Sequence, residues 1–521
     1  MRTAARCSGI VLSAALLFQA FAAVGSPTLV EVPDAALKTV LCEALGKAQG
    51  DITLQDMESL TELDAFASGI TDLTGLEAAH NLRVLDLSGN DLQGIIQLAR
   101  LTELETLALD GTGIRSLQPL RGLAKLRCLG LASNAIADIE PLRECTELEE
   151  LDLRNNVLSD VSALTNLTKL RSLNLQGNSV QDLTPLGQLA QLEELYLGQN
   201  AIGDVAPLSE LRDLRVLTLE GNEIGDVSPL TGLAHMEKLW LSSNNVSSIR
   251  PLRALVSLEE LDLAENGVSD VSPLGDLGGL ETLKLQGNLI SDIDALASLV
   301  DLRVLDLAGN RITEIASLES VQALQVLDVS GNQIGDLQSL GKLSSLWSLD
   351  ATGNDLTSVI GLSELQALTV LRLAGNRICD LRPLACLAAL EYLDIAWNDV
   401  RDLSPLSGCT SLRVLIASAN AVEGISPLTG LACLREVDLS HNRIRNTLPL
   451  AGFTNLHRLN LAYNNIRSLG PLVQSSRGAL PIGASVDLRG NYLDIVPGSQ
   501  TMADIEILEA AGIAILYDPQ R

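Results

Sequence analysis

Aromatic residues are scarce in this chain, where Phe, Trp and Tyr together make up 2% of the 521 residues. A core without large rings must be built from Leu, Ile, Val and Ala, and such a core suits a narrow, regular stack. The scarcity also makes each exposed ring noteworthy, because aromatic side chains dominate binding hot spots.

Long apolar runs are missing except at the start of the chain. Arg2 and Arg6 flank the beginning of the stretch GIVLSAALLFQAFAAV, and Ala20-Phe21-Ala22 offers a cleavage site, a combination typical of an export signal. The stretch is short for a membrane span, which needs about 20 apolar residues. We therefore predict a signal peptide over residues 1–25, with an uncleaved anchor as the alternative. The sequence shows no later apolar segment, lipidation cysteine or sorting motif, so we expect a secreted, periplasmic or cell-envelope protein of a bacterium, without a transmembrane anchor after signal cleavage.

Positive charge is the next deficit. Without Arg2 and Arg6 the chain keeps 34 basic residues against 65 acidic ones, a formal charge of −31. A body so acidic repels nucleic acid and anionic membranes and favours basic partners. We expect no nucleic-acid partner.

Catalytic constellations are also missing from the sequence. The four histidines (His80, His235, His441 and His457) are scattered, and no Ser-His-Asp spacing, phosphate-binding glycine loop or zinc spacing appears. We predict that the protein is not an enzyme and has no cofactor or metal. Catalysis by residues that converge across one face of the fold is the weaker alternative.

What the chain has in abundance is one phrase, repeated every 22 residues. A fixed period of this length predicts a solenoid, in which each unit must stack on its neighbours to bury its apolar face. Stepping backwards from Asn134 gives Thr112, Asn90 and Ser68. Stepping forwards gives only asparagine: Asn156, Asn178, Asn200, Asn222, Asn244, Asn266, Asn288, Asn310, Asn332, Asn354, Asn376, Asn398, Asn420, Asn442 and Asn464.

Within a unit, the apolar spacing is three except at one place, where it becomes two. Counting from the asparagine, that place is the pair at −5 and −3, such as Leu151 and Leu153. A spacing of two indicates a strand with one buried face. We predict a strand over residues 150–154, with Glu150, Asp152 and Arg154 pointing outward.

Stacked units should place these strands in one parallel sheet, about 4.8 Å apart. The return limb, apolar at every third residue and often with Pro at +7, favours a 3₁₀ or extended turn over a full helix. The predicted fold is thus an α/β repeat solenoid, a horseshoe with a concave parallel sheet, convex 3₁₀ or extended turns and a helical N-terminal cap.

The asparagine column has a structural explanation. The chain turns sharply after each strand and leaves backbone N–H and C=O groups without partners near the core. A short amide carries both donors and an acceptor, so it can satisfy these groups. Thr112 and Ser68 keep a hydroxyl for part of that role.

The cysteines indicate no metal site. Loss of Cys7 would leave seven, so at least one stays unpaired in a monomer. Cys145 and Cys409 stand where other units place Leu, which predicts small core residues. The others show no C-x-x-C spacing. A disulfide between Cys386 and Cys409 of adjacent repeats is left open.

Both ends of a solenoid need caps. We predict an N-terminal cap over residues 26–63, which opens with an amphipathic helix whose N-cap is Asp34. The 22-residue repeats should then occupy residues 64–472. Residues 473–521 form an irregular repeat and C-terminal cap, in which TMADIEILEAAGIAILYD predicts a helix and a last strand.

The pattern LxxLxxLxLxxNxIxDLxPL, matched from Leu167 to Leu186, resembles bacterial leucine-rich repeat proteins of the 22-residue, internalin-like class. The stretch DITLQDMESLTELDAFASGITDLTGLE resembles the cap that precedes such repeats. The resemblance covers nearly all of the chain after residue 25 and implies a concave sheet that binds a protein partner. The immunoglobulin-like domain and wall anchor of the invasion proteins are absent from this sequence, so the resemblance does not imply host invasion.

The outward strand position −4 carries the candidate binding site. Tyr196 and Trp240 should lie two strands apart, about 10 Å, with Thr218 between them. Lys238, Lys284 and Glu220 should surround the two rings. We predict that these six residues bind a protein or peptide, while the plainer alternative is that the rings merely pack on neighbouring side chains.

The same position carries a run of carboxylates at Asp306, Asp328 and Asp350. Side chains of like charge so close repel, and a cation would relieve the repulsion. No oxygen-rich loop accompanies the run, which argues against calcium. The sequence therefore predicts an exported, monomeric, non-enzymatic scaffold, with a polysaccharide-binding adhesin or structural envelope protein as the alternative.

Overall fold

The computed structural model describes residues 28–48, 50–449, 455–475 and 480–521. The predicted signal peptide and its cleavage site lie outside these ranges. Among the described residues, no helix combines the length and the apolar character needed to cross a bilayer.

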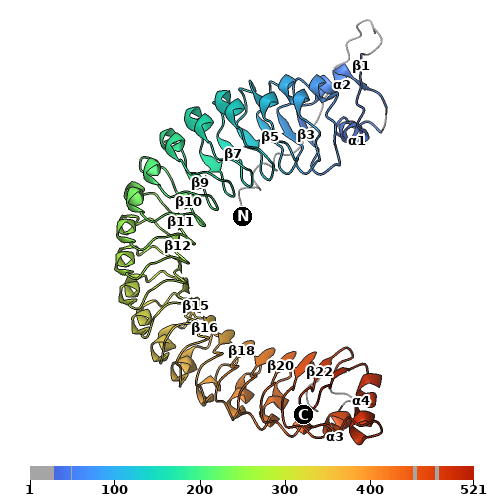
Figure 1. The fold of residues 1–521 in the computed structure, drawn as a ribbon, viewed down its shortest axis with the longest axis vertical. Helices are drawn as coiled ribbons and strands as arrows, with labels where there is room; N and C mark the ends of the chain where they lie inside the picture. The colour runs from blue at the N-terminus through green and yellow to red at the C-terminus, as the bar shows by residue number, and fades with distance from the viewer. Residues whose placement is uncertain (1–27, 49, 450–454, 476–479) are drawn as a thin grey trace.

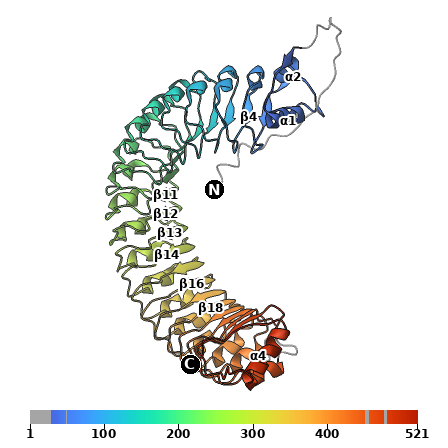
Figure 2. The ribbon, with the colours of Figure 1, turned by 45° about the vertical axis from the view of Figure 1, so that its right-hand side comes forward.

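The described chain forms an open arc with the sheet on its inner side (Figure 1). Each strand pairs in parallel with the next along the chain, from β3 and β4 at one end to β22 and β23 at the other. The register advances by one 22-residue repeat per strand, so that Leu217 lies beside Leu239. The predicted horseshoe with a concave parallel sheet is confirmed, and Figure 2 shows the same arc from a second side.

The 21 described strands of this sheet are three residues long. They are β3 (Glu62–Asp64), β4 (Val84–Asp86), β5 (Thr106–Ala108), β6 (Cys128–Gly130), β7 (Glu150–Asp152), β8 (Ser172–Asn174), β9 (Glu194–Tyr196), β10 (Val216–Thr218), β11 (Lys238–Trp240), β12 (Glu260–Asp262), β13 (Thr282–Lys284), β14 (Val304–Asp306), β15 (Val326–Asp328), β16 (Ser348–Asp350), β17 (Val370–Arg372), β18 (Tyr392–Asp394), β19 (Val414–Ile416), β20 (Glu436–Asp438), β21 (Arg458–Asn460), β22 (Ser485–Asp487) and β23 (Ala514–Leu516).

The strand predicted over residues 150–154 is therefore shorter, because regular pairing ends at Asp152. The inward and outward assignment is confirmed, since Leu151 and Leu153 are buried and Glu150 is exposed. The sheet's hydrogen bonding continues for one more residue, where the Leu153 N–H donates to the Asn174 carbonyl at 2.8 Å.

The convex side is built from short 3₁₀ helices, as the three-residue spacing predicts. They are η2 (Leu76–Ala78), η3 (Ile96–Arg100), η4 (Gln118–Leu120), η5 (Glu140–Glu144), η6 (Ser162–Asn166), η7 (Thr184–Gln188), η8 (Ala206–Leu208), η9 (Ser228–Gly232), η10 (Arg250–Ala254), η11 (Ser272–Asp276), η12 (Asp294–Ser298), η13 (Ala316–Ser320), η14 (Gln338–Lys342), η15 (Ile360–Glu364), η16 (Arg382–Leu384), η17 (Ser404–Gly408) and η18 (Ser426–Gly430). The four helices η12 to η15 lack proline and keep the same form, so proline assists this turn without being required for it.

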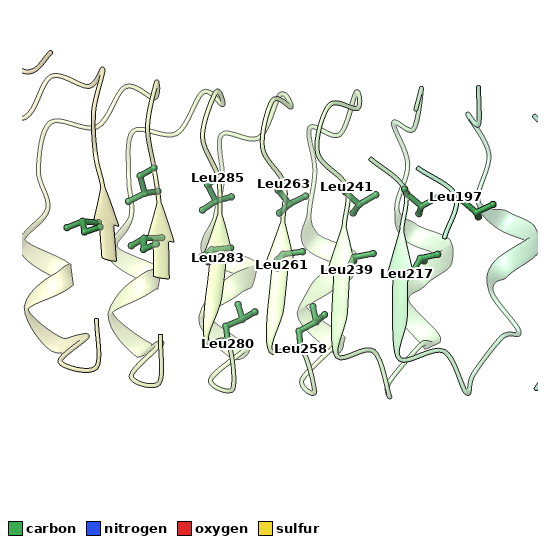
Figure 3. Close-up of a cluster of buried hydrophobic side chains, with 14 of the residues drawn as sticks. Leu197, Leu217, Leu239, Leu241, Leu258, Leu261, Leu263, Leu280, Leu283 and Leu285 are labelled. Carbon is green, nitrogen blue, oxygen red and sulfur yellow. The ribbon is translucent and has the colours of Figure 1, made fainter. Parts of the chain in front are cut away.

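Between the two sides runs one core of leucine rows. Figure 3 shows the rows formed by Leu217, Leu239, Leu261 and Leu283, each side chain beside its counterpart in the next repeat. The core extends from Leu37 in the N-terminal cap to Ile515 in β23. Because it runs through the predicted boundaries between cap, repeats and C-terminal segment, those boundaries stay predictions.

The asparagine column joins neighbouring repeats as well as closing its own turn. The Asn310 amide donates to the carbonyls of Leu307 at 3.0 Å and of Leu285, in the preceding repeat, at 2.9 Å. Its Oδ1 accepts the Ile290 N–H at 3.0 Å. Thr112 keeps one equivalent bond, from its hydroxyl to the Leu109 carbonyl at 2.8 Å. The predicted structural role of this column is confirmed.

Two helices and a small antiparallel pair close the N-terminal end of the core. The helices are α1 (Ala35–Ala44) and α2 (Leu54–Ser59), and the pair is β1 (Leu29–Val30) with β2 (Ile52–Thr53). Asp34 is the N-cap of α1, as predicted, because its Oδ1 accepts the N–H groups of Ala36 and Leu37, both at 2.9 Å.

The C-terminal end is closed by α3 (Gly470–Ser475) and α4 (Gln500–Ala510), which precede or follow β22 and β23 (Figure 2). The helix and last strand predicted in this segment are α4 and β23. Ser499 caps α4 by accepting the Met502 N–H at 3.3 Å.

Candidate binding surface on the concave face

The concave face is lined by the outward residues of each short strand. Because the register is strict, residues 22 positions apart form a column along the arc. Tyr196 of β9, Thr218 of β10 and Trp240 of β11 are direct neighbours in one such column. The next strands continue it with Asp262 and Lys284.

Tyr196 is a half-buried ring whose hydroxyl has a partner on the same strand. The hydroxyl donates to Glu194 Oε2 at 3.2 Å. Burial raises the pKa of the Tyr196 hydroxyl, and the nearby Glu194 charge adds to the rise, so the phenol stays protonated and available as a donor.

Trp240 is held in the same way, by a carboxylate on the following strand. Its Nε1 donates to Glu260 Oε1 at 3.0 Å. The other oxygen of Glu260 lies 3.3 Å from Lys238 Nζ. Glu260 thus fixes the ring and neutralises a lysine at once, and this arrangement limits the rotamers that Trp240 can adopt.

Thr218 lies between the two rings and is only 2% exposed. We predicted it as a contact residue, but in this structure it is covered, so we expect it to support the rings rather than to touch a partner. Burial raises the pKa of the Glu220 carboxyl, and a hydrogen bond with Thr218 opposes the rise.

Glu220 lies flat across the neighbouring repeat. Its Oε1 accepts Gln176 Nε2 at 3.2 Å, two repeats away, while its Oε2 is buried without a hydrogen-bond partner in the described part of the chain. A Cβ at Gly198 would collide with the carboxylate, so glycine at that position makes room for it. Leaving one carboxylate oxygen buried and unpaired is unfavourable by roughly 1–3 kcal/mol.

Lys284 extends the site by two strands beyond Trp240. Its Nζ lies 3.4 Å from Asp262 Oδ2, so the two side chains form an ion pair on the concave face. The structure thus brings together Tyr196, Trp240 and both predicted lysines over β9–β13, and each lysine already has a carboxylate partner.

Sequence reasoning missed the two carboxylates that hold the rings. Glu194 and Glu260 both occupy the first outward strand position, six residues before the asparagine. The pattern that identifies them is a glutamate on the strand of the ring or on the next strand, two residues before the ring's column. That pattern has meaning only once the register between strands is known.

The aspartate run has a local structural role. Asp306 Oδ1 accepts the N–H of Ala308 at 3.0 Å, and Asp328 and Asp350 bond in the same way to Ser330 and Thr352. Each carboxylate therefore supports the turn that follows its strand, and this explains why aspartate recurs there. Burial raises the pKa of Asp306, and the charge of Asp328 adds to the rise.

The remaining candidates of the sequence stay apart from this surface. Over the described residues, no three His, Cys, Asp or Glu side chains are grouped so as to hold a metal ion. Cys145 and Cys409 are buried in the core as predicted. Cys386 and Cys409 are both free thiols in this structure, so the disulfide left open by the sequence is not formed.

The fold and the column of outward residues define a class of protein that the sequence comparisons also identify. A family model described as "Leucine Rich repeats (2 copies)" matches residues 146–188, 190–232, 234–276 and 278–320. A second, "Leucine Rich repeat", matches residues 78–95, 322–337 and 430–447. The chain belongs to the leucine-rich repeat family.

Within this family the chain is similar to internalins. An internalin from Listeria monocytogenes shares 30% sequence identity, with a TM-score of 0.53, over 71% of this chain and 98% of the internalin. No curated protein matches the sequence significantly.

Two more distant structures share the fold. A leucine-rich repeat protein from Leptospira interrogans is 23% identical, with a TM-score of 0.55, over 75% of this chain and 92% of its own. The Arabidopsis receptor kinase HAESA, solved with the peptide hormone IDA and a co-receptor, is 21% identical, with a TM-score of 0.60, over 81% of each chain.

Proposed function

We propose that this protein is an exported, non-enzymatic scaffold of bacterial origin that binds a protein or peptide through its concave face. The observation that carries the proposal is the pair of rings at Tyr196 and Trp240, two strands apart in one column and each held by a carboxylate. Pre-organised aromatic side chains bind without losing much conformational entropy, and this is how interface hot spots gain affinity.

The distribution of charge supports a basic partner. The chain outside its first 25 residues carries a formal charge of −31, and the lysines near the rings are already paired. A partner that brings Lys or Arg to Glu220 would also supply the missing hydrogen bond to its buried oxygen. HAESA, which shares the fold, was solved with a peptide bound, and this supports the proposal at the level of fold alone.

A peptide-display selection against the purified protein tests the proposal and does not require the partner to be identified first. Selected peptides should bind the wild type and lose at least about tenfold in affinity on the double variant Tyr196→Ala/Trp240→Ala, because removal of a hot-spot ring typically costs more than 1 kcal/mol. Trp347→Ala is the matched control, since Trp347 is 43% exposed and lies outside the surface.

Equal binding of wild type and double variant would show that the rings are not the anchor. Retention of the wild type on isolated cell-wall polysaccharide, lost in the same double variant, would instead favour the alternative of a polysaccharide-binding adhesin or structural envelope protein. Circular dichroism of both variants checks that the fold is intact.

A further inference from the structure

A second set of exposed side chains lies away from the concave site, on the edge of the sheet where the strands end. The residue just before each repeat's asparagine turns with a positive φ, and glycine occupies it in many repeats, such as Gly353 and Gly375. In the C-terminal repeats this position holds Trp397, His441 and Tyr463, with φ angles of 54°, 55° and 57°. Bulky side chains are unfavourable in this left-handed region, so three of them near one another call for an explanation.

These rings are presented to solvent rather than packed into the core. Trp397 is 70% exposed and Tyr463 is 41% exposed. His441 and Tyr463 belong to adjacent repeats and stack with centroids 4.4 Å apart and planes at 15°. The guanidinium of Arg521 lies 5.3 Å from the Tyr463 centroid and adds a cation beside the stack. The backbone fixes their neighbourhood, because the His441 N–H donates to the Ala462 carbonyl at 2.9 Å.

The charge around these rings differs from that of the rest of the protein. Residues 439–486 contain five arginines, two histidines and no aspartate or glutamate. Arg443, Arg445 and Arg467 are exposed. In the described part of the chain none of the three forms an ion pair within 4.0 Å, whereas Arg377 on the same edge pairs with Asp355 at 2.8 Å.

We propose that His441, Arg443, Arg445, Tyr463 and Arg467, which we call the arginine–aromatic rim, bind an acidic polysaccharide of uronic-acid type. The flat apolar face of a sugar ring stacks on an aromatic ring, and the carboxylate of the same sugar accepts two hydrogen bonds from a guanidinium. Rim residues recur every repeat, about 5 Å apart, so a chain of sugars lying across the turns meets one set of partners after another.

Charge favours this ligand over other anions. A nucleic acid carries a charge on every nucleotide and, beyond the rim, would meet a protein body of strongly negative charge. A uronic-acid oligomer has at most one charge per sugar and presents a stacking face on each unit. The glycan site is separate from the concave surface over β9–β13, so the two proposals stand or fall independently.

Binding of polygalacturonate to the purified full chain, measured by affinity gel electrophoresis and calorimetry in 0.15 M salt, tests the rim. Wild type should bind polygalacturonate and not neutral dextran. The variant Arg443→Gln/Arg445→Gln should bind at least about tenfold more weakly. Its matched control is Arg115→Gln/Arg311→Gln, because Arg311 and Arg115 occupy the same two places in other repeats. This control should bind as wild type does.

A second variant removes the rings without disturbing the turn. His441→Gly/Tyr463→Gly places glycine at two left-handed positions, where it is the favoured residue, so the thermal midpoint should not fall steeply while binding is lost. Failure of the wild type to bind polygalacturonate overturns the proposal, and so does equal weakening by the control pair. Tighter binding of an oligothymidylate or of polyglutamate than of polygalacturonate also overturns it.

Discussion

At the scale of the residue, the asparagine of each repeat is the most constrained side chain in the molecule. Asn332 donates to Leu307 and Val329 at 2.9 and 3.0 Å and accepts from Ile312 at 3.0 Å. Two of these three groups belong to the preceding repeat, so one amide closes a turn and binds two units together. A hydroxyl cannot replace it fully, as Thr112 shows by making only part of the set.

Asn332→Ala should therefore lower the free energy of unfolding by about 3 kcal/mol, because it leaves buried backbone groups without partners. Urea denaturation measures the change. Gln333→Ala, at the exposed position next to it, should change stability by less than about 0.5 kcal/mol. Similar losses for both variants would mean that the amide's bonds are not what holds the turn.

At the scale of the element, side chains set how neighbouring repeats and caps meet. Arg127 lies 2.7 Å from Glu149, and Arg215 pairs with Glu237 in the same way. Exposed pairs contribute little to stability, about 0–1 kcal/mol each. They favour the observed order of repeats, since many neighbouring repeats carry opposite charges at this position.

The cap helix α1 is tied to the first repeat by one carboxylate. Besides the two N–H groups of α1, Asp34 accepts the N–H of Thr71 at 2.9 Å and of Asp72 at 3.1 Å. Partial burial by itself would raise the pKa of Asp34, but the hydrogen bonds from Leu37, Thr71 and Asp72 outweigh it and lower that pKa to about 2. The ionised form thus stabilises the capped end.

The stability that Asp34 contributes should be present above pH 4 and should be lost as the pH falls toward 2. The sign follows from linkage, because a group whose pKa is lower in the folded state releases its proton more easily there. Asp34→Asn still caps a helix but cannot titrate, so the difference in stability between wild type and this variant should shrink from pH 5 to pH 2. Hydrogen exchange of α1 amides measures it, and a difference independent of pH would contradict the assignment.

At the scale of the whole molecule, the protein is a one-dimensional stack in which each repeat contacts its neighbours. The leucine rows run without interruption from the N-terminal cap to β23 (Figures 1 and 3). Stability in such an array is approximately a sum of repeat and interface contributions. The arc therefore tolerates changes in the number of repeats better than changes in their phase.

Excision of residues 322–343 removes one full repeat and joins Val321 to Ser344, which continues the pattern in phase. This variant should fold, unfold cooperatively and be shorter along the sheet by about 5 Å. Excision of residues 322–332 removes half a repeat and puts the leucine and asparagine columns out of phase, so cooperative unfolding should be lost. Chemical denaturation and small-angle scattering distinguish the two, and equal behaviour would contradict the solenoid argument.

The periodicity of the sequence was enough to determine the class of fold, the inward leucines, the 3₁₀ limb, the asparagine role and the Asp34 cap. Each of these follows from contacts that recur identically in every repeat, so one unit contains the information. Only the tertiary structure decided the fate of individual outward side chains. Thr218 is covered, Glu260 holds Trp240, and Tyr463 stacks on His441 because of what the next repeat places beside them. Such contacts depend on side chains 20 to 22 residues away, which become neighbours only when the register is fixed.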